Sequence, residues 1–377
     1  MYLSRTPMNN AEPVTAFPKK PNSYKYTISF ILLLVAAAGG YYFYEMTRNA
    51  TLPVDDFVNM KPFFAKLADR QKLADEYADA NKDMVADTPT DAAKLLKVEE
   101  IGFSAVGTID EERLKAEQED WKDLMAALEK ATGKKVKYLT DLNGADVQMD
   151  ALKTGRLHVT AFNTGAVPAA VNSAGFVPLF CPANSEGQYG YQMQILVKAD
   201  SAIQKPEDLK GKKIGFVAMS SNSGARAPMY TLKEKFGLLP GRDYTHGLTG
   251  DHFSSIGLLV YGNEYDAVCV ASDLKDRAVT AGKIRFGAES KELKADQFRV
   301  IYTSDTFPPL CFGVPHNLPP EMRATVEKVF KDYQFANSSA KKYAQQGKVK
   351  FAPVNYEKDW KFVREIDATL SKFTEIP

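Results

Sequence analysis

This chain of 377 residues contains few cysteines, and its net charge is close to zero. Its three cysteines, Cys181, Cys269 and Cys311, show no CxxC or His/Cys spacing, which argues against a zinc site, and no cofactor is expected. Three buried free thiols are the default; if one disulfide forms, we favour Cys181 with Cys311, because both fall in the same predicted lobe. A net charge of +1 argues against nucleic acid as a partner.

The beginning of the chain combines a polar tail with a long apolar run. Residues 1–25 contain Pro, Asn, Lys and Ser without an apolar period, which predicts a disordered tail. Residues 26–44 carry no charge and are long enough to cross a bilayer core as a transmembrane anchor. The basic residues precede this run, so the positive-inside rule leaves the tail in the cytoplasm and exports the rest.

Two interpretations of this apolar run stay open. Ala36, Ala37 and Ala38 resemble a cleavage site, which is typical of a removed signal peptide. The long polar leader and the apolar continuation past these alanines favour a retained anchor instead. No cysteine directly follows the run, so a lipoprotein anchor is not expected. We therefore predict a single-pass protein of the cell membrane, with its C-terminal domain in the periplasm or another extracytoplasmic space.

Residues 45–97 are rich in Ala, Asp and Lys, and Phe63, Phe64 and Leu67 are spaced loosely as on a helix. This composition predicts a helical spacer between the anchor and the next domain. An extra helix packed on that domain is the other interpretation.

From residue 98 onward, strand and helix patterns alternate, which predicts parallel sheets covered by helices. Two such sets joined by two crossings predict a two-lobed α/β fold with a ligand between the lobes. We place lobe 1 at 98–198 plus 304–377 and lobe 2 at 199–303. The predicted strands are 98–103, 136–139, 157–162, 177–181, 191–198, 213–217, 244–248, 265–271, 299–303 and 310–314, and predicted helices cover 112–132, 147–154, 166–174 and 253–261.

A run of small hydrogen-bond donors stands where the strand at 213–217 gives way to a helix. The first N–H groups of a helix have no partner within it and carry partial positive charge. With the hydroxyls of Ser221 and Ser223 and the Asn222 amide, they could hold one tetrahedral oxyanion. Gly224 lets the backbone approach closely. The simpler interpretation is an ordinary N-cap, which needs only one such residue.

A series of segments between residues 98 and 335 matches a known family in content and order. The segments are Gly102-Phe103-Ser104, LKTGRLHVTAFNTG at 152–165, QILVKADSAIQKPEDLKGKKIGFVAMSSNSG at 194–224, Gly250-Asp251-His252, YDAVCVASDLKDR at 265–277, and RVIYTSDTFPPL with LPPEMR within 299–323. They resemble the phosphate, phosphite and phosphonate-binding periplasmic proteins of ABC transporters, the PhnD-like family, over about two-thirds of the chain. The resemblance implies a Venus-flytrap fold, a type II periplasmic binding protein.

The resemblance also implies roles for particular residues. The family's Ser-Thr-Ser-Gly turn, which grips phosphorus oxygens, falls on residues 221–224, with Asn222 in place of the middle Thr. A family histidine that donates to the same anion falls on His252, and a family acid that meets a ligand amine matches Asp273. The implied ligand-binding set is Ser220, Ser221, Asn222, Ser223, Gly224, His252, Asn163, Thr164, Tyr191 and Asp273.

Three departures from the family pattern bear on the ligand. A second family acid is deleted in the segment 307–310, one family tyrosine aligns with Phe162, and another aligns near 143–145. These departures weaken the case for 2-aminoethylphosphonate and leave phosphate, phosphite or another phosphonate open.

The resemblance implies a membrane-tethered solute-binding component of an ABC importer, with a small phosphorus oxyanion, a permease and its ATPase as partners. The residues alone support only anion binding, so a ligand-sensing ectodomain that signals through a separate membrane partner is the alternative. An enzyme is not expected, because Ser221 has no histidine in a short stretch that could act as its base. Arg226 could add a charge-assisted bond to the anion or lie solvated on the helix face.

Overall fold

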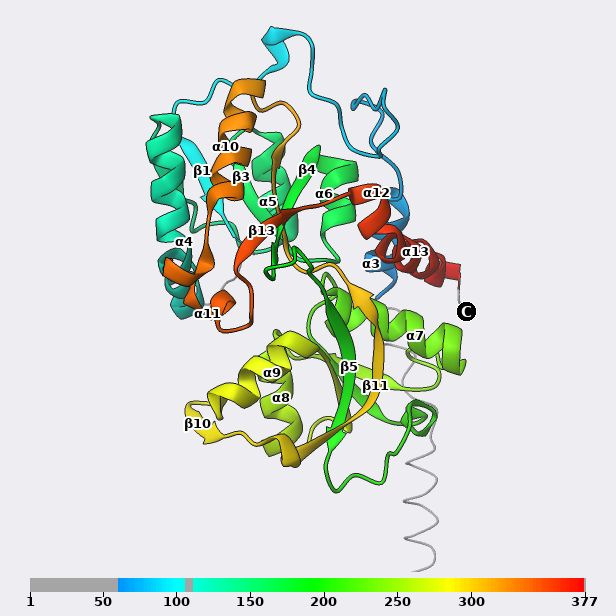
Figure 1. Cartoon of the computed structure of the whole chain (residues 1–377). Coiled ribbons are helices and arrows are strands. Elements are labelled where there is room, and N and C mark those ends of the chain that lie inside the picture. Colours follow the sequence, from blue (N-terminus) through cyan, green and yellow to red (C-terminus); the bar gives the residue numbers. More distant parts are fainter. Residues whose placement is uncertain (1–59, 106–110, 376–377) are drawn as a thin grey trace, which may run out of the picture. The chain divides into compact units, whose positions relative to one another are not determined.

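Two mixed β-sheets with helices packed on them organise the chain (Figure 1). The computed structural model describes residues 60–105 and 111–375, which belong to one compact unit, Thr51–Pro377. The predicted tail (1–25) and the predicted anchor (26–44) lie outside the described residues. Within the described ranges, no helix has both the length and the apolar character needed to span a membrane.

The first sheet has six strands in the order β13-β4-β12-β3-β1-β2. β1 is parallel to β2 and β3, whereas β12 is antiparallel to β3 and β4, and β13 is antiparallel to β4. The expected parallel sheet is therefore mixed, because the chain returns from the second sheet and inserts β12 between β3 and β4. The elements are β1 (Ile101–Ser104), β2 (Val136–Tyr138), β3 (Val159–Phe162), β4 (Phe176–Ala183), β12 (Cys311–Pro315) and β13 (Lys350–Pro353), with α4 (Glu111–Thr132), α5 (Ala145–Lys153), α6 (Val167–Ala174) and α10 (Pro320–Asp332).

The second sheet has five strands in the order β11-β5-β8-β6-β7. β6 is parallel to β7 and β8, and β5 is antiparallel to both β8 and β11. The elements are β5 (Tyr191–Lys198), β6 (Lys213–Phe216), β7 (Thr245–Leu248), β8 (Ala267–Ala271) and β11 (Phe298–Phe307), with α7 (Ala227–Phe236), α8 (His252–Tyr261), α9 (Ser272–Ala281) and the hairpin β9 (Lys283–Phe286)–β10 (Glu289–Glu292).

The limits of the two lobes differ from the predicted ones. β5 pairs along its length with β11, from Lys198 opposite Phe298 to Tyr191 opposite Phe307, so both strands belong to the second sheet. The chain therefore crosses between lobes at 184–190 and 308–310, not near residues 198 and 304. This correction assigns Tyr191 to the second lobe, directly beside the crossing.

The segment 60–97 contains less helix than the predicted spacer. α3 (Lys61–Asp69) is followed by largely irregular chain with one short 3-10 helix, η1 (Ala92–Lys94). Phe64 and Leu67 of α3 are buried, and the helix contacts α13 (Lys361–Leu370) and η6 (Ser371–Glu375). α3 is thus an extra helix packed on the domain, the second interpretation of this segment.

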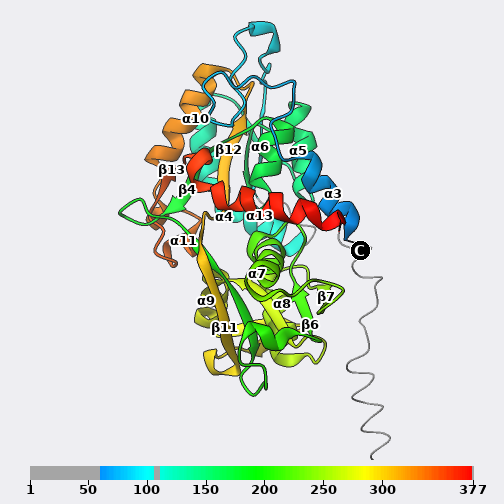
Figure 2. The ribbon, with the colours of Figure 1, turned by 90° about the vertical axis from the view of Figure 1, so that its right-hand side faces the viewer.

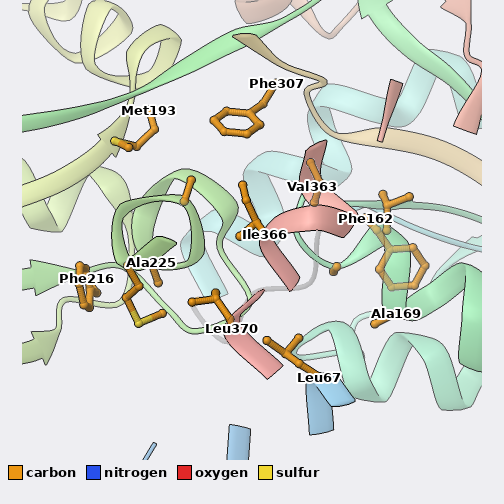
Figure 3. Close-up of a cluster of buried hydrophobic side chains, with 14 of the residues drawn as sticks. Leu67, Phe162, Ala169, Met193, Phe216, Ala225, Phe307, Val363, Ile366 and Leu370 are labelled. Atoms are coloured by element: carbon orange, nitrogen blue, oxygen red, sulfur yellow. The ribbon is translucent and has the colours of Figure 1, made fainter. Parts of the chain in front are cut away.

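The C-terminal helix α13 shares a hydrophobic core with both lobes. It packs against α3 and α7 (Figure 2). Its apolar face, with Val363, Ile366 and Leu370, is fully buried. Figure 3 shows this face between Phe162 of β3 and Phe216 of β6, and all five side chains belong to one buried cluster. Helix α13 therefore fastens the first lobe to the start of α7 in the second.

The remaining short elements connect these parts. They are η2 (Pro206–Leu209), η3 (Asn222–Arg226), η4 (Ala295–Gln297), η5 (Phe335–Asn337), α11 (Lys341–Ala344) and α12 (Tyr356–Asp359).

The three cysteines are free and buried. Cys181 and Cys311 lie on the neighbouring strands β4 and β12, and the two thiols interact. Burial, reinforced by that contact, raises the pKa of the Cys181 thiol well above its usual value. The pair favoured for a disulfide is therefore adjacent but present as thiols.

His158, just before β3, is expected to make the fold sensitive to acid. Its Nδ1 accepts a hydrogen bond from the Gly102 amide at 2.9 Å, and burial lowers its pKa to about 4. In the unfolded chain a histidine titrates near roughly 6.5. The unfolded state therefore binds the proton first, and stability falls by about 3 kcal/mol as the pH drops from 6.5 to 4.

Urea unfolding at several pH values measures this dependence. In His158→Gln, whose amide oxygen can accept the same hydrogen bond, the histidine contribution to the pH dependence should disappear. Equal pH dependence in the native protein and the variant would show that His158 does not carry the effect.

Candidate functional site

A cavity of about 400 Å³ is lined by residues of both lobes. The turn after β3, the start of β5, the turn after β6 and the starts of α8 and α9 all reach it. Nine of the ten predicted ligand-binding residues line this cavity: Asn163, Thr164, Tyr191, Ser220, Ser221, Asn222, Ser223, His252 and Asp273. The tenth, Gly224, lies buried directly behind the serine turn, residues 220–223.

The serine turn leads into a π-helical turn, η3, which continues as α7. Ser221 is its N-cap: the Ser221 Oγ accepts a hydrogen bond from the Gly224 amide at 3.1 Å. The backbone amides of Asn222 and Ser223 donate to no acceptor in the described part of the chain. The first turn contains no acidic residue. Ser221 therefore acts as an ordinary N-cap. Two backbone amides, those of Asn222 and Ser223, remain without an acceptor at the positive end of the helix.

Gly224 is required by close packing behind this turn. A Cβ at position 224 would lie 2.5 Å from the Cβ of Val217 and 2.8 Å from the Ser221 Oγ. Any larger residue would push the helix start away from β6. Gly224 thus shapes the turn without facing the cavity.

A chain of hydrogen bonds links the serine turn to the crossing between the lobes. The Asn222 Nδ2 donates to the Tyr191 hydroxyl (3.4 Å), which donates to the Thr164 Oγ1 (3.0 Å). Thr164 in turn donates to the carbonyl of Pro308 at 2.6 Å. The Oδ1 of Asn222 is buried with no hydrogen-bond partner among the described residues. The Tyr191–Thr164 bond therefore ties the two lobes together, and Asn222, bound to Tyr191 within the second lobe, leaves an acceptor at the cavity wall.

His252 is the first residue of α8 and reaches the same cavity from a second helix start. Its Nδ1 accepts a hydrogen bond from the Ala271 amide at 3.2 Å, so in the neutral ring the proton lies on Nε2. The preceding residue, Asp251, caps α8 by accepting from the amides of Phe253 and Ser254. The α8 start thus carries its own carboxylate, whereas the η3 start does not.

Arg226 takes neither of the two positions that the sequence suggested, beside the anion or in solvent on the helix face. Its side chain is buried, and its Nη1 lies 3.0 Å from both carboxylate oxygens of Asp367 on α13. The same guanidinium donates to the carbonyls of Gly165 and Met219. Arg226 is neither solvated nor an anion ligand, because a residue far along the chain neutralises it.

Residues 107–360 match the family described as ABC transporter, phosphonate, periplasmic substrate-binding protein. The chain belongs to this family. Its members are substrate-binding proteins of ABC transporters rather than enzymes.

Solved structures share the two-lobed periplasmic-binding-protein fold. A binding-protein component of an ABC phosphonate transporter from Pseudomonas aeruginosa matches with a TM-score of 0.58 at 19% identity, over 72% of this chain and 87% of that one. PhnD1 from Prochlorococcus marinus, solved with methylphosphonate, matches with a TM-score of 0.58 at 15% identity, over 73% of this chain and 99% of that one. The two-lobed α/β fold expected from the sequence is confirmed.

Of the three predicted departures from the family pattern, only the segment 307–310 reaches the cavity. Phe162, which we predicted to replace a family tyrosine, points into the core and packs edge-on against Phe176. Pro309 and Leu310, in the loop that we predicted to be shortened, line the cavity.

The sequence did not reveal the wall built by the C-terminal part of the first lobe. Lys342, Tyr343, Gln346 and Lys348 all line the cavity. They lie in and after the four-residue helix α11, where no periodic pattern or motif singled them out. Only their position in the folded chain brings them to the site.

Proposed function

We propose that this protein is an extracytoplasmic binding component that holds a phosphorus oxyanion, a phosphonate, phosphite or phosphate, in the cavity between its lobes. The observation that supports the proposal is the pair of backbone amides of Asn222 and Ser223, which have no acceptor and lie at a helix start without a carboxylate. Such groups bind tetrahedral anions without a counter-charge. The hydroxyls of Ser220 and Ser223 and the His252 ring lie around the same space.

Because these donors are neutral, the protein would discriminate between oxyanions by the number of hydrogen bonds and by cavity shape. Closure of the lobes around the ligand would then create the surface that a permease with its ATPase recognises. Residues 26–44 would tether the protein to the membrane, with the described residues on the extracytoplasmic side.

Calorimetric titration of the full-length protein with phosphate, phosphite, methylphosphonate and 2-aminoethylphosphonate tests the proposal. At least one of these ligands should bind. Ser223→Ala should then weaken binding by about 10- to 150-fold, the loss of one hydrogen bond to a charged group.

The matched control is Ser290→Ala, which removes an exposed hydroxyl from the β9–β10 hairpin and should leave affinity unchanged. If none of the four oxyanions binds, the proposed ligand class is wrong. If one binds and Ser223→Ala binds it equally well, the serine turn is not the site.

A further inference from the structure

Asp273 presents an unpaired carboxylate oxygen to the cavity. It is the second residue of α9, and its Oδ1 is shielded from solvent with no hydrogen-bond partner in the described part of the chain. Burial raises the pKa of Asp273, while the Leu274 amide and the charges of Lys348 and Arg277 act in the opposite direction. A buried carboxylate oxygen without a partner costs free energy, so a cation within the cavity would stabilise this group.

Lys348 reaches the same cavity from the first lobe. Its backbone is fixed by a turn: Gly347 has a φ of 73°, and the Lys348 amide donates to the carbonyl of Tyr343 at 2.9 Å. The next amide, of Val349, donates to the carbonyl of Ala183 on β4 at 2.8 Å. The Lys348 backbone is therefore held in the wall, and its half-buried side chain extends from this fixed position.

The other cations of the cavity are already engaged. Lys342 pairs with Asp120, and the Arg277 guanidinium lies over the Phe253 ring, 4.7 Å from its centroid. Among residues 60–105 and 111–375, no carboxylate, that of Asp273 included, lies within 4.0 Å of the Lys348 ammonium, so Lys348 acts on Asp273 without a direct ion pair. Lys348 is thus the cation that remains available to Asp273 from the opposite lobe.

We propose that Lys348 is a built-in ammonium group that supplies the counter-charge of Asp273 across the cleft and selects against ligands that carry their own ammonium. A ligand ammonium placed beside Asp273 would meet the like charge of Lys348 in a poorly solvated space. The protein would therefore prefer phosphorus oxyanions with a small uncharged substituent or none. This inference rests on the proposed binding of a phosphorus oxyanion and names its substrate class.

Methylphosphonate and 2-aminoethylphosphonate test the inference, because the second carries an ammonium group that the first lacks. Calorimetry on the full-length protein should show methylphosphonate binding on the order of tenfold more tightly or better. Lys348→Met should reduce this preference at least tenfold. Lys350→Met, which removes a lysine on β13 outside the cavity, should leave the ratio of affinities within threefold. Tighter binding of 2-aminoethylphosphonate by the native protein, or an unchanged ratio in Lys348→Met, would overturn the inference.

A ligand-free readout separates this inference from the proposed function. In a carbon-13 NMR titration of the Asp273 carboxyl group, Lys348→Met should raise its pKa, whereas Lys350→Met should not. If the Asp273 pKa rises in Lys348→Met but none of the oxyanions binds, the interaction between Asp273 and Lys348 stands. The proposed function and ligand selection by Lys348 are then both rejected. An Asp273 pKa that is the same in the native protein and in Lys348→Met would reject the interaction between the two residues.

Discussion

Replacing Arg226 by methionine is expected to lower the free energy of unfolding by about 3–5 kcal/mol. The Arg226 and Asp367 side chains are only 5% and 4% exposed, so the variant leaves a carboxylate buried without its partner. The carbonyls of Gly165 and Met219 lose a donor as well. Urea unfolding of the full-length protein followed by tryptophan fluorescence measures the loss, since Trp360 is buried next to α13.

Two matched variants distinguish a buried unpaired charge from loss of the arginine side chain alone. Arg226→Met combined with Asp367→Leu removes both charges and should recover much of the stability, because an apolar pair replaces an ion pair at little cost. Arg156→Met removes a surface arginine that pairs with Asp141; the two side chains are 48% and 58% exposed, so this variant should cost less than about 1 kcal/mol. A double variant no more stable than Arg226→Met would contradict this account.

The pH dependence of the Arg226→Met defect follows from Asp367. Burial raises the pKa of Asp367 to about 6 even beside Arg226, and removal of the guanidinium raises it further. A carboxyl group whose pKa is raised in the folded state loses stability as the pH rises from its unfolded value, roughly 3.9, through the folded one. The defect should therefore be smaller at pH 5 than at pH 8.

This ion pair links the C-terminal helix to the candidate site. Arg226 ends the π-helical turn that begins with the unused amides, and it contacts the first lobe at Gly165 as well as α13 at Asp367. The buried cluster around Ile366 includes side chains of both lobes. The position of the serine turn thus depends on residues far away in the sequence, at the end of the chain.

The sequence predicted what depends on local pattern. The period of Trp121, Leu124 and Leu128 predicted α4, and all three side chains are buried. The strand, serine turn and helix at 213–236 appear in the predicted order. Nine of the ten candidate residues line one cavity, although their role in ligand binding remains a prediction.

Long-range packing decided what the sequence could not predict. The burial of Arg226 depends on Asp367, 141 residues away, and no local spacing connects the two. Lys348 reaches the cavity only because the chain returns along β13 to the edge of β4. The assignment of β5 to the second sheet likewise depends on its partners, since its own sequence fits either lobe.

Gly165→Ala is expected to weaken oxyanion binding by about 5- to 150-fold, equivalent to about 1–3 kcal/mol of overpacking. A Cβ at position 165 would lie 2.6 Å from the carbonyl oxygen of Ser220 and 3.0 Å from the amide nitrogen of Asn222. These are backbone atoms, so they cannot rotate away as a side chain could. The serine turn must shift as a whole, and the two unused amides move with it.

The control is Gly237→Ala at the far end of α7, where an added Cβ meets no atom within 4 Å but the φ of 67° strains the backbone. That variant should lower stability by roughly 1 kcal/mol without changing affinity. Calorimetry and urea unfolding on both variants separate the two effects. Unchanged affinity in Gly165→Ala would mean that the first lobe does not position the anion-binding turn, because the close contact at Ser220 and Asn222 is the route by which the substitution acts.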